Sequence, residues 1–154
     1  LTVAGATQTG ITDERVFFEG QALTISPLQL AIAASALSND GVLAAPRIVN
    51  GYEDESAAWV TLPKLSTGTT AFTPAQVDEI TSLLQNDTAL QWQAVSTTET
   101  ADGDPITWFV AGSTSNWQGQ PYVIVVALET KDPTGATEIG LTLLNQVMNL
   151  TANN

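Results

Sequence analysis

The sequence predicts a single α+β domain in which an antiparallel sheet packs with three helices. Two segments with helical N-terminal signals come first, three strand-like segments separated by short turns follow, and an amphipathic segment ends the chain. Short connections favour antiparallel pairing, because parallel neighbours need a long crossover. No repeat or linker divides the 154 residues, so we expect one domain spanning residues 1–154.

Each of the first two helices is predicted from a capping box. In Ser26–Gln29 a serine can cap the helix, proline occupies the first helical position, and glutamine can bond back to the cap. Thr73–Gln76 repeats this arrangement, and its helix is expected to run to about Leu90. Apolar residues at helical spacing follow both signals, and the same spacing predicts a third helix after the turn Asp132–Gly135.

Three strands are expected at Gln91–Thr98, Ile106–Gly112 and Tyr122–Glu129, separated by turn-rich segments. A fourth strand could come from the segment Leu1–Val16, whose first residues are strand-like. Between the first two helices, Tyr52–Leu62 contains an acidic run followed by apolar residues, which indicates a hairpin or a surface excursion.

The inward positions of these elements predict the core. They are the apolar residues at helical or alternating spacing: Leu28, Ile32, Ile80, Leu84, Phe109, Val123, Val125, Leu144 and Met148. The last expected strand is long, apolar and uncharged, so an open edge on it would be an association hazard. We expect the segment Leu1–Val16, a second copy of the chain or an upstream domain to cover it, in that order of preference.

Charge and composition exclude several function classes. Four basic residues face sixteen acidic ones, a net charge of −12, which argues against nucleic acids and anionic membrane surfaces as partners. Cysteine and histidine are absent, so thiolate chemistry and the commonest general base are missing. No apolar stretch approaches the roughly 20 residues of a membrane helix, and Leu1–Gly10 has no signal-peptide pattern. Glu53–Glu55 and the pair Asp102 and Asp104 lack calcium-loop spacing, so we expect no metal or other cofactor.

A series of motifs carries a family resemblance. Glu19–Ala31 is followed by Ser38–Pro46, then by the strand Trp108–Gly112, then by Tyr122–Glu129, and finally by the small pair Gly135–Ala136. In order and spacing these segments resemble the C-terminal part of the transpeptidase domain of class B penicillin-binding proteins, over about residues 19–150. The resemblance implies a partial β-lactamase/transpeptidase-like fold and an extracytoplasmic location in the cell envelope.

The resemblance also implies a chemistry that can be compared with these residues. The family forms an acyl-enzyme on the serine of an S-x-x-K motif, assisted by S-x-N and by a third motif, K-S/T-G. No serine here has a lysine three positions later, and the first two motifs would lie upstream of residue 19. The third motif should fall within Ala94–Thr100, at Val95, Ser96, Thr97 and Thr98, where hydroxyls remain but the lysine and the glycine do not. Lys64–Thr70 has a similar composition but precedes the second helix, and we interpret it as a polar loop.

Two functions follow, and we expect no catalytic residue in this chain alone. The first is a non-catalytic transpeptidase-like domain that serves as a structural or interaction module in peptidoglycan synthesis. Its partners would be the rest of its own polypeptide or a cell-envelope protein. The alternative is the C-terminal piece of an active D,D-transpeptidase whose serine and lysine lie upstream. A third possibility is an unrelated small α+β binding domain.

Overall fold

The computed structural model describes residues 25–43, 45–46, 49–63, 68–84, 90–100 and 102–152. In chain order the elements are α2 (Pro27–Ser38), β1 (Val42–Leu43), β2 (Gly51–Glu53), β3 (Trp59–Thr61), β4 (Thr69–Thr70), α3 (Pro74–Leu84), β5 (Gln91–Glu99), β6 (Pro105–Ser113), β7 (Val123–Leu128) and α4 (Pro133–Ala152). The expected α+β class, with three helices and three consecutive antiparallel strands, is confirmed. Residues 85–89, where the second helix was expected to continue, lie outside the described ranges.

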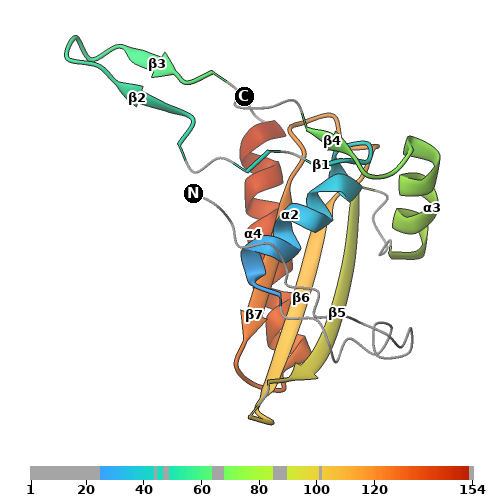
Figure 1. Ribbon diagram of the computed structural model, residues 1–154. Coiled ribbons are helices and arrows are strands. Elements are labelled where there is room, and N and C mark those ends of the chain that lie inside the picture. The colour runs from blue at the N-terminus through green and yellow to red at the C-terminus, as the bar shows by residue number, and fades with distance from the viewer. Residues whose placement is uncertain are drawn as a thin grey trace, which may run out of the picture.

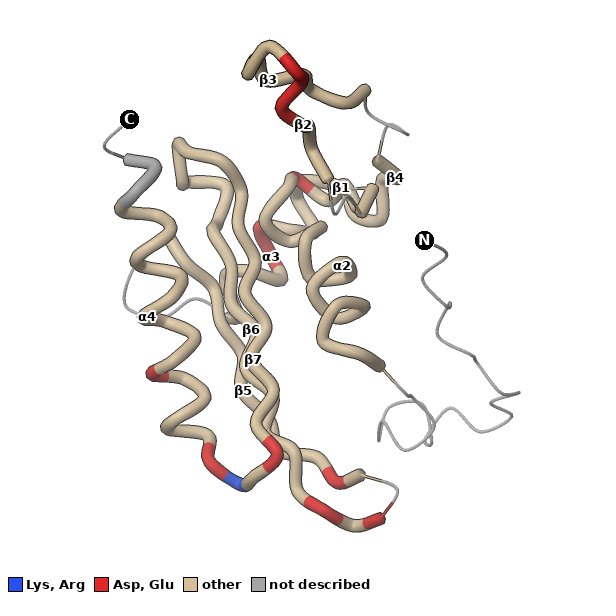
Figure 2. Tube along the Cα trace, turned by 90° about the vertical axis from the view of Figure 1, so that its left-hand side faces the viewer, with Lys and Arg blue, Asp and Glu red and all other residues tan. Residues whose placement is uncertain are grey.

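The main sheet has the order β5-β6-β7, and both pairs are antiparallel. On β6, Trp108 lies opposite Ser96 on one side and Ala127 on the other. Figure 2 shows the sheet nearly edge-on, with α4 against one face and α2 against the other. Because side chains alternate along a strand, residues of β6 point in turn towards α4 and towards α2.

Local sequence signals position the helices. Ser26 Oγ accepts a hydrogen bond from the Gln29 N–H at 3.2 Å, and Gln29 Oε1 accepts one from the Ser26 N–H at 2.8 Å, so the predicted capping box is confirmed. At α3 the Thr73 N–H donates to Gln76 Oε1 at 2.9 Å, which confirms the second signal. Asp132 caps α4 by accepting a hydrogen bond from the Gly135 N–H at 2.9 Å.

The hydrophobic core lies between α4 and the sheet. Phe109 and Ala111 of β6 are buried there against Leu144 and Met148 of α4. The helix approaches closely because it has glycine at position 140. A Cβ at Gly140 would lie inside van der Waals contact with the Phe109 ring.

The core prediction is confirmed in part. Phe109, Leu144 and Met148 are buried as expected. Five further predicted positions are only half-buried: Ile32, Ile80, Leu84, Val123 and Val125. Leu28 was placed wrongly, because it is 50% exposed. It lies in the first turn of α2, where its side chain lines an open pocket instead of a packed interface.

Two short ladders accompany the main sheet. β1 pairs with β4, a contact that the sequence did not suggest. β2 pairs with β3, which confirms the expected hairpin within Tyr52–Leu62. Figure 1 shows this hairpin extending away from the body of the molecule.

The outer edge of β7 has no strand partner within the described ranges, where its neighbour is β6. The segment Leu1–Val16, which we expected to cover this edge, lies outside the described residues. The expectation that something pairs with β7 therefore stays a prediction.

Candidate functional site

The predicted third-motif positions lie in the second half of β5, an edge strand of the sheet as described. Their side chains divide between the two faces. Val95 and Thr97 share a face with Gln91, whose side-chain amide bonds Asn145 of α4. Ser96 and Thr98 share the face on which α2 packs. The four positions therefore do not form one cluster, because consecutive side chains point to opposite sides.

The Thr97 hydroxyl is hydrogen-bonded to the buried side chain of Thr107. Its oxygen lies 3.1 Å from the hydroxyl of Thr107 on β6. The Thr107 hydroxyl in turn donates to the Thr130 carbonyl at 2.7 Å and accepts a hydrogen bond from the Asp132 N–H at 3.0 Å. These bonds fix the segment that leads into α4, so the Thr97 hydroxyl belongs to a structural network.

The remaining positions offer an uncharged surface. Thr98 Oγ1 accepts a hydrogen bond from the indole N–H of Trp108 at 3.1 Å. Ser96 is exposed, and the Val95 side chain is 47% exposed. Residues 91–113, which contain both β5 and β6, include no lysine, arginine or histidine. Among the residues that the structure describes, Lys131 in the turn before α4 is the only basic side chain. This strand therefore has no fixed positive charge with which to hold a carboxylate.

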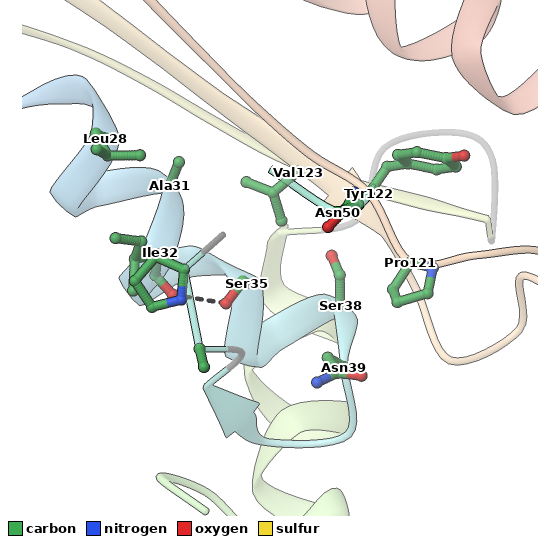
Figure 3. Close-up of a pocket in the computed structure, with 12 residues that line it drawn as sticks. Leu28, Ala31, Ile32, Ser35, Ser38, Asn39, Asn50, Pro121, Tyr122 and Val123 are labelled. Carbon is green, nitrogen blue, oxygen red and sulfur yellow. Dashed lines mark hydrogen bonds between the residues drawn. The ribbon is translucent and has the colours of Figure 1, made fainter. Parts of the chain in front are cut away.

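A separate pocket of about 580 Å³ opens beside α2. Figure 3 shows Leu28, Ala31 and Ile32 of the helix on one side of it, and Pro121 to Val123 on the other. Apart from the Tyr122 phenol, its lining has no titratable side chain.

The two serine hydroxyls in this pocket form hydrogen bonds within the fold. Ser35 donates to the Ile32 carbonyl at 2.7 Å. Ser38 accepts a hydrogen bond from the indole N–H of Trp92 at 3.0 Å, which links α2 to β5. The pocket suits apolar contact rather than acid–base or nucleophilic chemistry. Sequence reasoning missed it because the apolar stripe of α2, its available signal, was assigned entirely to the core.

Within the described ranges, no group of three or more aspartate or glutamate side chains is arranged to hold a metal ion. Asp54 instead caps a turn, where hydrogen bonds from the Ser56 side chain and from the backbone of Ala58 and Ser56 lower the pKa of its carboxyl. Of the lysine-containing loop Lys64–Thr70, residues 64–67 lie outside the described ranges. None of the described helices is long and apolar enough to cross a membrane.

Comparison with known proteins identifies a family and a fold. Residues 3–149 match the family model of the penicillin-binding protein transpeptidase domain. No curated protein matches the chain with significance. Among solved structures, the imipenem acyl-enzyme complex of penicillin-binding protein A from M. tuberculosis is similar, with a TM-score of 0.71 and 21% sequence identity. The match covers 91% of this chain but 35% of that one, so the chain spans about a third of that protein's length. The resemblance seen in the sequence is thus confirmed.

Proposed function

Because the chain belongs to the penicillin-binding protein transpeptidase family, we propose that it is a transpeptidase-like domain that does not itself form an acyl-enzyme. It acts as a structural or interaction module of a cell-envelope protein concerned with peptidoglycan. Its partners are the remainder of its own polypeptide or another envelope protein. The single observation that carries this proposal is that β5, which contains the candidate third-motif positions, has no basic side chain.

The absence of the third-motif lysine from β5 would weaken binding of a substrate carboxylate. The family's third motif uses its lysine to hold the carboxylate of the substrate or of a β-lactam, and a charge-assisted bond to a carboxylate is roughly twice as strong as a neutral one. Val95 and Ser96 occupy the candidate lysine positions, and neither side chain can supply the charge. The nearest basic residues along the sequence are Lys64 and Lys131.

The absence of the third-motif glycine would restrict how closely a substrate backbone can approach β5. Glycine in a strand allows another backbone to approach closely. Thr97 or Thr98 occupies that position here, and both hydroxyls are bonded to side chains of β6. A side chain at either position, unlike glycine, limits how closely another backbone can approach the strand.

A second candidate function is the C-terminal piece of an active D,D-transpeptidase. It is favoured by one observation, that the chain spans about a third of the length of the M. tuberculosis protein. The S-x-x-K serine and lysine would then be supplied by another part of the polypeptide. In this case another cation would have to replace the lysine of the third motif.

The mass of the intact chain after incubation with benzylpenicillin tests the proposal. We expect an unchanged mass, because the sequence contains no S-x-x-K motif and no histidine to activate a hydroxyl. A family enzyme of known activity, treated in the same way, provides the positive control. A stoichiometric mass increase on this chain, located by peptide mapping to a serine or threonine, would overturn the proposal.

A further inference from the structure

The hairpin formed by β2 and β3 presents an exposed aromatic surface that the proposed function does not use. Figure 1 shows the pair projecting from the body of the molecule, well away from the main sheet. The Trp59 side chain is 68% exposed and that of Tyr52 is 51% exposed. By strand alternation these two rings lie on opposite faces of the hairpin.

The Trp59 ring lies over Gly51 of the neighbouring strand. Gly51 lies beside it, and a Cβ on Gly51 would come within 2.8 Å of the ring atom Cε2 and 2.9 Å of Cζ2. The indole therefore packs onto the glycine backbone, while most of its surface remains in solvent. One side of the indole is therefore in contact with the hairpin, and the other is open to a binding partner.

The turn that joins the two strands is equally well defined. The Asp54 carboxylate accepts hydrogen bonds from the Ser56 N–H at 2.9 Å, the Ser56 hydroxyl at 2.7 Å and the Ala58 N–H at 3.0 Å. Ala57 adopts a φ of 61°, which is the left-handed conformation that closes the turn. The side chains of Glu53 and Glu55, on either side of Asp54, are exposed.

Charge and geometry together indicate what the hairpin can bind. Glu53 is the direct cross-strand partner of Trp59, so their side chains share a face with Cβ atoms about 5 Å apart. Residues 49–63 contain three acidic side chains and no basic one. The Trp59 face thus combines an open π surface with an adjacent carboxylate.

We propose that this face is a docking surface for an arginine displayed on a partner protein. The guanidinium stacks on the solvent-facing side of Trp59 and donates hydrogen bonds to the Glu53 carboxylate. Arginine suits the site better than lysine, because its planar group stacks on an aromatic ring and pairs with a carboxylate through two parallel bonds. The hairpin is small, so the contact is weak and transient.

The test is a ¹H–¹⁵N NMR titration of the whole chain with peptides of alternating arginine and alanine, and of alternating lysine and alanine. We expect saturable shifts of the Trp59 indole N–H and of the Glu53 amide, with the lysine peptide binding more weakly, because an ammonium lacks the planar stacking and the two parallel bonds of a guanidinium. Loss of the cation–π contact, worth about 0.5–1 kcal/mol at an exposed site, would weaken binding of the arginine peptide roughly two- to fivefold. The acidic turn that carries Glu99, Asp102 and Asp104 is an internal control. It has exposed carboxylates without an exposed tryptophan.

Two variants separate the contributions. Trp59→Leu retains an apolar side chain over Gly51 and should abolish the preference for arginine. Glu53→Gln changes only an exposed charge, leaves the turn intact and should weaken binding of both peptides. Equal shifts at the Glu99–Asp104 turn, equal affinity for the two peptides, or unchanged binding by Trp59→Leu would each overturn the proposal.

Discussion

Truncating Leu144 to alanine tests whether α4 is docked on the sheet as the structure shows. Leu144 has no exposed surface and lies in the cluster around Phe109. The change removes three carbon atoms, worth about 2.4 kcal/mol at about 0.8 kcal/mol each. A residual cavity of roughly 50 Å³ would add about 1.2 kcal/mol. We therefore expect a loss of about 3.6 kcal/mol, within a range of about 2–5 kcal/mol.

The adjacent residue provides a matched control. Leu143 is on the same helix and is 44% exposed, so Leu143→Ala has the same change in helix propensity with much less burial. We expect it to cost less than about 1 kcal/mol. Urea unfolding followed by circular dichroism, with equal m-values in all three proteins, measures both changes. A loss below about 0.5 kcal/mol for Leu144→Ala, or equal losses for the two variants, would refute the docking of α4.

Three further predictions follow from the same packing and from the hairpin turn. Gly140→Ala should destabilise the chain by about 1–3 kcal/mol in urea unfolding, because the clash with Phe109 outweighs the roughly 1 kcal/mol that alanine gains in a helix. A gain in stability would contradict the close approach of α4 to the Phe109 ring. Thr107→Val should cost about 1–3 kcal/mol of stability, because the buried hydroxyl of Thr107 forms hydrogen bonds with the backbone before α4. Thr107→Ser keeps a hydroxyl and should retain most of the stability. Equal losses in the two variants would show that the hydroxyl is unimportant. Hydrogen bonds from Ser56 lower the pKa of the Asp54 carboxyl in the folded hairpin. The Asp54 carboxylate therefore stabilises the hairpin at a pH above the pKa of this group in the unfolded chain, and that stabilisation is lost as the pH falls through the lowered pKa of the folded state. An NMR titration that gives Asp54 a pKa at or above 3.8 would contradict this.

The elements predicted best are those whose signals are local. The capping boxes at Ser26 and Thr73 need only three neighbouring residues to specify the start of a helix, and both are present. The exposure of Leu28 could not be predicted in this way. A helical period shows which face of a helix is apolar, but it does not show whether a neighbour covers that face.

The third-motif positions show a second limit. The sequence left the lysine position open between Val95 and Ser96, because counting back from Trp108 depends on the length of the turn. A one-residue slip moves a side chain to the other face of the sheet. The structure places Val95 on the α4 side and Ser96 on the α2 side. The two assignments would therefore put the lysine position on opposite faces of the sheet.

We propose that this transpeptidase-like domain does not support acylation. The most direct measurement is labelling of the natural polypeptide that contains the chain with a fluorescent penicillin, followed by denaturing electrophoresis. An active penicillin-binding protein in the same preparation provides the positive control, and a heat-denatured sample shows the background. We expect no label on the polypeptide while the control is labelled. Saturable labelling that unlabelled penicillin prevents would show that the domain supports acylation and that the active-enzyme alternative is correct.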